Sequence, residues 1–309
     1  MKKIFFIMIT FILCSSIFAV QNSNIIFSFF DLGVGARAAG MGEAFTSVAD
    51  DSSAVYWNPA GLGLLNNIEI SVTYDKWFMD TFYQHMTAGF PLSIGTIGID
   101  TFYMNYGKFE SIDDSGVSLN KEIYPYNFGG SIAYGIKLNK SFLLGVSSKF
   151  IYQTIDDNTN FGFAFDTGGI FRINNFSIGF NIQNLGVEKS YNLPIKFNLG
   201  GSFNLLDLNN NLLILAIKGS LILNADFILN LGAEYVFMRD FSLRVGYKIR
   251  LDEANEIEEL NGIGFGLGYG TSFMKIDYAI VFHGELGQIH KIALTFKFDT
   301  GNKEKTNKK

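Results

Sequence analysis

Cysteine and proline are scarce in this chain. Its 309 residues include a single cysteine, Cys14, and four prolines. One cysteine near the start excludes intramolecular disulfides, and it leaves the remainder of the chain without thiol catalysis or a cysteine-based metal site. The few prolines occur beside 33 glycines. This balance is suited to closely packed strands joined by compact turns.

Charge is also sparse. Charged residues make up 17% of the chain and the formal net charge is −5, so no basic footprint for nucleic acid is present. Hydrophobic residues make up 48%, including 32 Phe and 14 Tyr. The most apolar stretch after the first 20 residues, 212–231, is interrupted by Lys218, Asn224 and Asp226. We therefore predict no transmembrane helix there.

The first 19 residues predict a signal peptide. Lys2 and Lys3 precede an apolar run over residues 4–13, and Ala19 offers a small residue for cleavage. The run is too short to favour a membrane-spanning helix. Lipidation at Cys14 is the alternative, although Leu13 directly before it fits a lipobox poorly. Either reading implies export.

From residue 68 onward, apolar and polar residues alternate. Phe161, Phe163 and Phe165, for example, are separated by Gly162 and Ala164. A period of two indicates strands with one face in an oily environment and the other in water. The strands that we predict are 68–75, 83–91, 94–104, 125–138, 141–155, 161–173, 176–185, 195–205, 212–222, 226–237, 241–251, 262–271, 274–282 and 290–298.

These strands predict an all-β fold, a transmembrane antiparallel β-barrel of about 14 strands over residues 67–299 in the outer membrane. Long connections, such as 105–124 and 252–261, alternate with tight turns, such as 174–175. Such an asymmetry between two rims is typical of outer-membrane barrels, and it places both chain ends on the periplasmic side. The tail 300–309 reads as disordered.

A large soluble β-sandwich or β-propeller would also alternate. Two features weigh against it. The apolar face carries Phe, Leu or Ile in almost every strand, and aromatic residues gather near strand ends, where a membrane interface would lie. The aromatic residues in question include Tyr74, Trp77, Tyr83, Tyr103, Tyr124 and Tyr269.

Residues 20–66 differ from the rest, because they are rich in glycine and alanine and show no sustained alternation. We predict a small N-terminal plug, or hatch, with short helices. Residues 33–38 also contain a G-x-G-x-x-A pattern, which alone would mimic a dinucleotide-binding fingerprint. No βαβ unit follows, so the small residues are better explained by close packing inside a barrel wall.

The segment 33–62 reads GVGARAAGMGEAFTSVADDSSAVYWNPAGL. It resembles the N-terminal region of FadL-type outer-membrane transporters of hydrophobic compounds, and it is most similar to the uncharacterised PorV/PorQ-like branch of that superfamily. Beyond residue 66 the resemblance is architectural. The matching residues are Gly33, Gly35, Arg37, Gly40, Gly42, Glu43, Ala44, Ala49-Asp50-Asp51 and Asn58-Pro59-Ala60-Gly61-Leu62.

The resemblance implies a fourteen-stranded barrel closed by a hatch that shifts to release an apolar ligand. In the FadL type the ligand leaves sideways at a kink in the third strand, which makes Gly95 and Gly98 lateral-gate candidates here. Plain packing relief is the alternative role for these two glycines. The hatch and gating residues that the resemblance implies are Arg37, Asp50, Asp51, Asn58, Pro59, Ala60 and Gly61.

Four inward-facing cations are candidates for binding an anionic head group: Arg172, Arg244, Lys248 and Arg250. The alternative is that charges in the lumen pair with one another, since a polar lumen is normal in such barrels.

Other polar residues give weaker signals. Asp50 and Asp51 fall far short of a calcium cage, so capping of a helix N-terminus is the better interpretation. His283 and His290 lie near an outer loop, but no catalytic motif surrounds them. We therefore expect no enzyme activity, no metal site and no cofactor.

The function that we predict is passive uptake of hydrophobic or amphipathic small molecules, such as long-chain fatty acids, through a hatch-gated outer-membrane channel. The expected partners are outer-membrane lipid and a hydrophobic ligand. The alternative is a PorV-like accessory or scaffold protein that serves secretion-system or surface proteins. A general water-filled porin is disfavoured, because a plug would block a wide pore.

Overall fold

The computed structural model describes residues 32–112, 117–156, 158–188, 193–208, 211–223, 227–251 and 262–299. The predicted signal peptide, Cys14, the acidic loop 252–261 and the tail 300–309 lie outside the described residues. Within the described residues, we found no helix that is long and apolar enough to cross a membrane.

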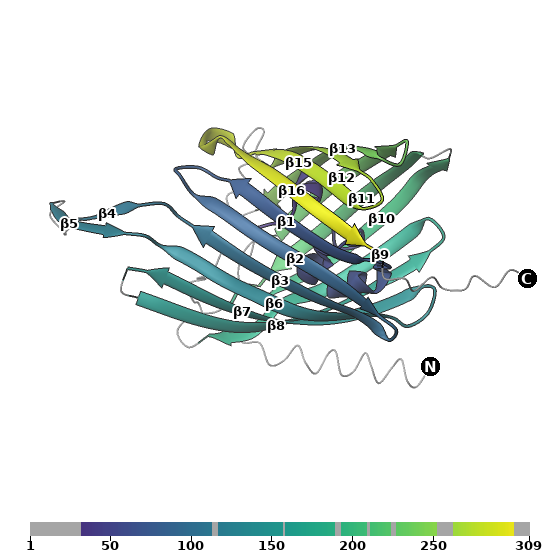
Figure 1. Ribbon diagram of the computed structural model, residues 1–309, viewed down its shortest axis with the longest axis horizontal. Coiled ribbons are helices and arrows are strands. Elements are labelled where there is room, and N and C mark those ends of the chain that lie inside the picture. Colours follow the sequence, from purple (N-terminus) through teal and green to yellow (C-terminus); the bar gives the residue numbers. More distant parts are fainter. Residues whose placement is uncertain are drawn as a thin grey trace, which may run out of the picture.

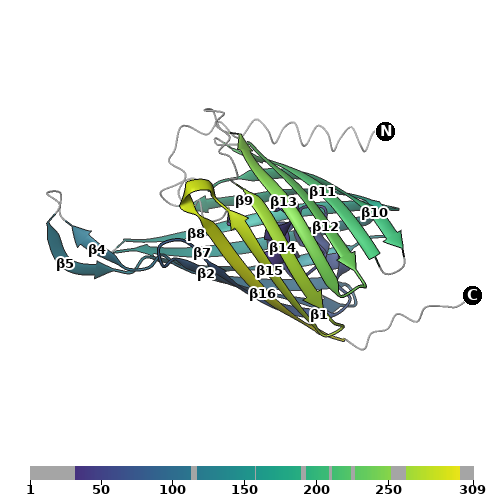
Figure 2. The ribbon, with the colours of Figure 1, turned by 90° about the horizontal axis from the view of Figure 1, so that it is seen from above.

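Fourteen of the described strands form one closed antiparallel barrel (Figures 1 and 2). Each strand pairs with its neighbours in the chain, and β1 closes the barrel against β16, with Tyr74 opposite Ile292. The strands are β1 (Ile68–Lys76), β2 (Phe82–Leu92), β3 (Gly95–Asn105), β6 (Tyr126–Lys137), β7 (Phe142–Ile155), β8 (Asn158–Ile173), β9 (Phe176–Glu188), β10 (Lys196–Leu208), β11 (Asn211–Ile222), β12 (Phe227–Phe237), β13 (Phe241–Leu251), β14 (Ile263–Gly270), β15 (Met274–Phe282) and β16 (Gln288–Phe298).

The alternation in the sequence corresponds to the two faces of this wall. Phe165 is 53% exposed, whereas the next residue, Asp166, is 2% exposed and faces the lumen. The same pattern of apolar residues outward and polar residues inward continues around the barrel. An apolar outer surface on a closed sheet is stable in lipid, because every strand edge is paired. The predicted transmembrane barrel is confirmed, and the chain is an outer-membrane protein.

The two rims differ as predicted. The short-turn rim carries tight connections such as 93–94 and 174–175, while the long-loop rim carries the largest one, 106–125 between β3 and β6. The segment 105–124 is more ordered than expected, since it contains a hairpin of β4 (Phe109–Ile112) and β5 (Ser118–Ile123). This hairpin projects well beyond the long-loop rim (Figures 1 and 2). A single turn of 3-10 helix, η4 (Gly284–Leu286), joins β15 to β16.

Aromatic rings form a band near the long-loop rim. A continuous series of ring contacts runs through Tyr74, Phe82, Tyr103, Tyr126 and Tyr152, which come from five neighbouring strands. Such a band suits the polar boundary of the lipid layer.

Two aromatic residues expected at this boundary lie elsewhere. Tyr83 is 4% exposed and its ring contacts His85 and Phe102, while Trp77 is half-buried. Both rings face the inside of the barrel rather than lipid. Tyr83 takes an inward position of β2, and Trp77 lies just past the end of β1 and lines a cavity in the lumen.

The inner segment (residues 32–66) lies inside the barrel. Its regular elements are short: α2 (Ala36–Gly40), α3 (Ala54–Trp57) and the 3-10 helix η3 (Pro59–Leu64). Figure 1 shows them as purple coils enclosed by the strands. Ala36, Phe45 and Val55 of this segment are completely buried. The wall and the inner segment therefore share one core.

Candidate functional site in the barrel lumen

Asn58 ties the inner segment to the wall. It is completely buried, its Oδ1 accepts from the N–H of Ala60 at 3.3 Å, and it precedes Pro59 at the start of η3. This is a side-chain cap on a turn whose first position suits proline. Its Nδ2 donates to the carbonyl oxygens of Thr46 (2.9 Å) and Gly169 (3.3 Å), the latter in β8. One amide thus holds two parts of the inner segment and one strand together.

Wall amides hold the inner segment from the other side. Asparagine and glutamine side chains of β9 and β12 donate to backbone carbonyls of the inner segment, so these carbonyls are satisfied. The donors and the carbonyls they reach, each at 2.6 Å, are Asn181 to Trp57, Gln183 to Tyr56 and Asn230 to Gly42.

Glycines in the wall allow the inner segment to sit this close. A Cβ added to Gly145 would lie 2.2 Å from the carbonyl carbon of Pro59, and one added to Gly168 would lie 2.2 Å from Oδ1 of Asn58. On the opposite side, a Cβ on Gly246 would lie 1.9 Å from the backbone N of Gly42. Real Cβ atoms do not approach so closely, so the contact surface is specified by glycine on both sides.

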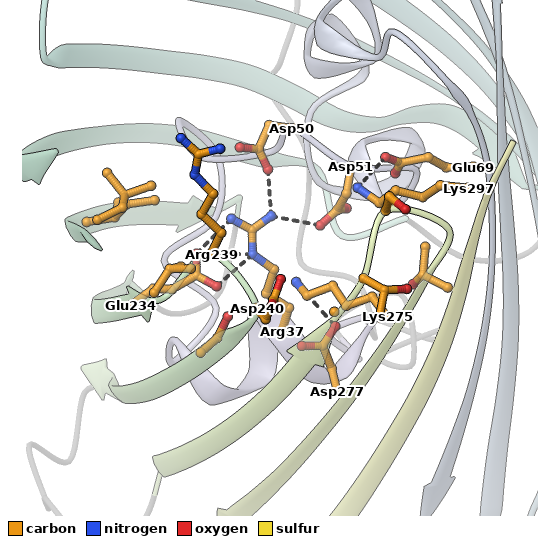
Figure 3. A pocket seen from close by; sticks show the side chains of 18 residues that line it. Arg37, Asp50, Asp51, Glu69, Glu234, Arg239, Asp240, Lys275, Asp277 and Lys297 are labelled. Carbon is orange, nitrogen blue, oxygen red and sulfur yellow. Dashed lines mark hydrogen bonds and ion pairs between the residues drawn. The ribbon is translucent and has the colours of Figure 1, made fainter. Parts of the chain in front are cut away.

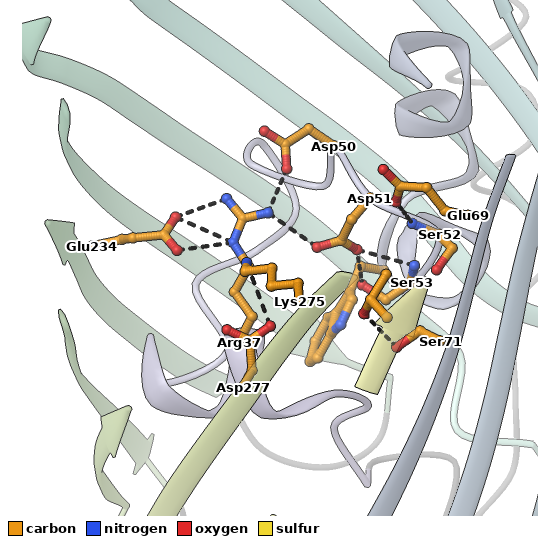
Figure 4. A network of polar contacts seen from close by, with 12 residues as sticks. Arg37, Asp50, Asp51, Ser52, Ser53, Glu69, Ser71, Glu234, Lys275 and Asp277 are labelled. Atoms are coloured by element: carbon orange, nitrogen blue, oxygen red, sulfur yellow. Dashed lines mark hydrogen bonds and ion pairs between the residues drawn. The ribbon is translucent and has the colours of Figure 1, made fainter. Parts of the chain in front are cut away.

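Arg37 of α2 is the centre of an ionic cluster (Figure 4). Its Nη1 lies 2.5 Å from Oδ1 of Asp50 and 3.0 Å from Oδ2 of Asp51. Its Nη2 lies 2.7 Å from Oε2 of Glu234 in β12. Asp51 Oδ1 also accepts from the backbone N–H of Ser53, directly before α3. Asp50 and Asp51 thus bind an arginine. The N-cap residue of α3 is Ser53 and the helix has no side-chain cap, so the capping role predicted for the two aspartates is not seen there.

The cluster continues into the wall. Oε1 of Glu234 accepts from Nε of Arg244 at 2.7 Å, and Nη1 of Arg244 lies 2.8 Å from Oδ1 of Asp277. Nζ of Lys275 lies 3.4 Å from Oδ2 of Asp277. The side chains of Glu234 and Arg244 are at most 1% exposed. Buried charges are stable only when paired, and here each has an opposite charge in contact.

A cavity of about 460 Å³ opens beside this cluster at the short-turn rim (Figure 3). We call it the short-rim cavity. Ten of its lining residues carry formal charge, so the space suits water and polar groups. They are Arg37, Arg239, Lys275, Lys297, Asp50, Asp51, Glu69, Glu234, Asp240 and Asp277.

A second cavity, of about 210 Å³, lies toward the long-loop rim, and we call it the long-rim cavity. Its apolar lining comes from Leu32, Trp77, Val281 and Ile289. Its polar lining includes Glu43, Lys248, Arg250, His283 and Lys291.

The charges at the long-rim cavity are largely paired. Nζ of Lys248 lies 2.7 Å from Oε2 of Glu43, and Nζ of Lys291 lies 2.7 Å from Oδ2 of Asp75. The indole N–H of Trp77 is buried and has no hydrogen-bond partner among the described residues. This cavity is therefore mixed in character, with apolar walls and a neutralised polar base.

Two carboxylates of the inner segment have lowered pKa values. Burial alone would raise the pKa of Glu43, but Lys248, Lys218 and Lys291 together outweigh it and lower the pKa from its ordinary 4.5. Burial likewise opposes the lowering at Asp51, where Arg37, Ser53 and Lys275 together outweigh it and lower the pKa from its ordinary 3.8. Both groups are charged at neutral pH, so both attachments are ionic there.

The four predicted head-group cations are not gathered at one place. Arg172 lies at the short-turn end of β8 and donates from Nε to Oγ of Ser177 at 3.2 Å. Arg244 is buried in the ionic cluster and Lys248 is bonded to Glu43, so these two follow the alternative of mutual pairing. Arg250 lines the long-rim cavity with Lys248. A head-group site built from all four is not formed.

The two lateral-gate candidates lie in an unbroken part of the wall. β3 pairs with β2 from Gly95 to Asn105 and with β6 from Thr96 to Asn105, without a register shift. A Cβ on Gly98 would lie 2.4 Å from Val55 and 2.7 Å from Leu62. Gly98 thus provides close contact with the inner segment, and a lateral gate at this strand stays a prediction.

The chemistry-bearing residues outside the cluster are satisfied locally. His85 Nε2 lies 3.1 Å from Oδ2 of Asp100, whose other oxygen accepts from Ser131 at 2.7 Å. His290 Nδ1 lies 2.6 Å from the hydroxyl of Tyr278. In the described part of the chain, no group of three or more histidine, cysteine or acidic side chains is placed to hold a metal ion.

Sequence reasoning missed Glu234 and Asp277, the two wall carboxylates of the cluster. A signal for Glu234 was present. The tight turn centred on Arg239 places residues equally distant from it opposite each other, and Glu234 does pair with Arg244 across β12 and β13. Arg37 and Glu234 are 197 residues apart, so no local pattern connects them.

Comparison with known proteins was informative at the level of structure. No protein-family model and no curated protein matches the sequence. The toluene transporter TodX of Pseudomonas putida matches with a TM-score of 0.62 and 12% identity, over 86% of this chain and 98% of that chain. The monoaromatic hydrocarbon channel CymD matches with a TM-score of 0.63 and 11% identity, over the same shares.

At these identities the likeness establishes the fold. The two matched structures are a transporter and a channel. The resemblance to the PorV/PorQ-like branch stays a prediction.

Proposed function

We propose that this protein is a passive outer-membrane channel for small hydrophobic compounds, with the inner segment as its barrier. The observation that carries the proposal is a barrel of the same fold as TodX and CymD whose lumen is occupied by residues 32–66, with a cavity toward each rim. A closed wall lets solutes pass only through the lumen or through a parted pair of strands.

The dimensions favour a compact ligand over a long-chain fatty acid. The long-rim cavity, at about 210 Å³, is smaller than the roughly 300 to 1,000 Å³ typical of sites for drug-sized ligands. Its apolar walls suit a hydrocarbon ring, and the indole N–H of Trp77 offers one donor. The pairing of Lys248 with Glu43 weakens the case for an anionic head group.

We further propose that the inner segment acts as a hatch in which Asn58, Pro59, Ala60 and Gly61 form the fixed side. Arg37, Asp50 and Asp51 form the ionic side. Such a barrier needs no energy source, because the ligand moves down its own concentration gradient.

The test is uptake by cells that carry this barrel in their outer membrane and lack a hydrocarbon channel of their own. Radiolabelled toluene and a labelled long-chain fatty acid are supplied separately. We expect toluene uptake to rise several-fold over cells with an empty vector, and fatty acid uptake to rise less. Toluene uptake equal to that of the vector cells would contradict the proposal.

A matched pair of variants locates the route. Val281→Trp fills the long-rim cavity, whereas Ile280→Trp adds the same ring at the neighbouring position on the other face of β15. We expect Val281→Trp to lower toluene uptake and Ile280→Trp to leave it unchanged, with equal amounts of folded barrel.

The hairpin of β4 and β5 favours a second candidate, an accessory protein that holds other proteins at the cell surface. It projects beyond the rim and exposes Phe109 (47%), Leu119 (56%) and Tyr124 (54%). Exposed apolar groups of this kind mark protein contact sites. Deleting residues 109–123 would release surface proteins and leave toluene uptake unchanged if this candidate is correct.

A further inference from the structure

The two cavities lie one above the other along the same part of the wall. On β15 the inward positions are Lys275 and Asp277, which line the short-rim cavity, then Ala279, then Val281, which lines the long-rim cavity. Inward positions on a strand are about 6.8 Å apart. On this strand, one alanine side chain stands between the two spaces.

The neighbouring strand repeats the arrangement. On β16, Thr295 lines the short-rim cavity, Lys291 and Ile289 line the long-rim cavity, and Ala293 lies between them. Ala279 and Ala293 are 0% and 4% exposed. The two alanines are diagonal neighbours across the strand pair, with Ala279 opposite Lys291 and Ala293 opposite Asp277.

The space between the two cavities, beside Ala279 and Ala293, is filled by α2. Ala36 and Ala39 of α2 form one buried apolar cluster with Ala279 and Ala293. On either side of this layer, Arg37 lines the short-rim cavity and Ala39 lines the long-rim cavity. A five-residue helix of small side chains is thus the partition between the cavities at β15 and β16.

The backbone on each side of α2 is suited to movement. Gly35, before the helix, and Gly42, after it, have φ angles of +84° and +58°. Glycine adopts this left-handed region and others without steric cost. Arg37 ties the helix to Asp50 and to Glu234, while the small side chains and backbone of the helix pack on glycines of β14.

We propose that the two cavities are halves of one conduit along β15 and β16, and that α2 is its gate. The inference rests on the proposed channel function and makes it more specific. The ligand passes from a space with apolar walls and a neutralised polar base into one lined by ten charged residues. A compact molecule that tolerates water, such as a single aromatic ring, fits both spaces, whereas a long alkyl chain would leave apolar surface against the charges.

The test uses single thiols in a full-length Cys14→Ser background. Val281→Cys, Ala279→Cys and Thr295→Cys place a thiol in the long-rim cavity, in the partition and in the short-rim cavity. Ala133→Cys is the matched control, because Ala133 is a buried inward alanine on β6 that packs in the main core cluster and lines neither cavity. A membrane-impermeant thiol reagent is added from the long-loop side.

We expect the thiol at position 281 to react fastest, the one at 279 to react more slowly by about tenfold, and the one at 133 to stay unreacted. Adding Glu234→Gln, which weakens the hold on Arg37, raises the rate at 279. Modification at 279 blocks toluene uptake. The proposal that α2 is a gate is contradicted if the thiol at position 279 stays as unreactive as the thiol at position 133 while the thiol at position 281 reacts.

Thiol labelling and toluene uptake together distinguish failure of the proposed gate from failure of the proposed channel function. Reaction at 279 without any toluene uptake by the parent chain contradicts the proposed function and supports an opening α2. Toluene uptake by the parent with no reaction at 279 supports the channel and overturns this route through it.

Discussion

The inner segment meets the wall in two different ways. At β6 to β8, η3 packs directly on strand backbone, and the polar contacts around it are neutral hydrogen bonds, such as that from Asn58 to Gly169. At β12 to β16, α2 also touches glycine, but it is held by ion pairs and lies between two cavities. One side is held by close packing and neutral hydrogen bonds, and the other by close packing together with ion pairs beside free space.

The difference teaches which side is able to move. Close packing against backbone is lost all at once, because a displaced helix leaves a void and unpaired amides. Ion pairs that border a cavity with a charged lining are exchanged for hydration at lower cost when water enters, because the dielectric there is then higher. We therefore infer that η3 is the fixed part of the barrier and α2 the movable part.

The largest effect on stability is expected from disrupting the close packing of η3 against β6 to β8. Gly145→Ala places a Cβ 2.2 Å from the carbonyl carbon of Pro59, which neither backbone can accommodate without moving. We expect a loss of about 3 kcal/mol or more in the stability of the assembled barrel, since overpacking against backbone is among the costly substitutions. This loss is measured by urea unfolding in detergent, with the gel mobility of the folded barrel as the readout.

The control for this variant is Gly201→Ala. A Cβ on Gly201 would meet only Ile217, at 3.8 Å, an ordinary van der Waals distance. We expect no measurable loss there. Equal stability of the two variants would show that close packing against Gly145 does not fix the position of η3.

The charged side is broken by Glu234→Gln. The change keeps the size of the side chain but removes the negative charge shared by Arg37 and Arg244. Removing one partner from a buried ion pair typically costs about 3 to 5 kcal/mol, and the remaining carboxylates near both arginines place this variant at the lower end. Because α2 is then held less firmly, we expect trypsin to cleave faster after Arg37. Mass spectrometry of the fragments measures the cleavage rate.

Glu110→Gln is the matched control, because Glu110 is exposed on the hairpin and lies far from the cluster. Cleavage after Arg37 should be unchanged in that variant. If Glu234→Gln also leaves it unchanged, the ionic cluster does not hold α2 and the comparison between the two sides fails.

Most of the wall could be predicted from the sequence, because lipid imposes a strict period of two. The strand 161–173, for example, was predicted from Phe161, Phe163 and Phe165, and β8 (Asn158–Ile173) begins three residues earlier. The hairpin of β4 and β5 was missed for the same physical reason. Its second strand, Ser118–Ile123, extends into water and has no continuous oily face to reveal it.

The lumen was less predictable, because its contacts are set by the closed shape rather than by local pattern. Arg37 was singled out through the family resemblance, but its wall partner Glu234 was not. Trp77 was expected at the membrane boundary, yet it lines the long-rim cavity. An inward or outward position follows from strand register, and Trp77 lies one residue past the end of β1, where the alternation no longer applies.

Acidification gives the smallest expected effect and separates the two sides without any substitution. Glu43 and Asp51 both have pKa values below their ordinary 4.5 and 3.8. A carboxylate with a lowered folded pKa contributes stability that is fully present above the ordinary value and is lost as the pH falls through the folded value. The attachments to Lys248 and Arg37 therefore weaken below about pH 4, whereas the neutral hydrogen bonds around η3 have no group that titrates there.

Hydrogen exchange measured by mass spectrometry at pH 6 and pH 3, corrected for the intrinsic exchange rates, checks this expectation. Protection of residues 36–40 should fall at pH 3, while protection of residues 59–64 should hold. Glu43→Gln removes one of the two titrating groups and should reduce the difference between the two pH values. Equal loss of protection in both segments would show that acid releases the whole inner segment from the wall as a single body. In that case α2 does not move independently of η3.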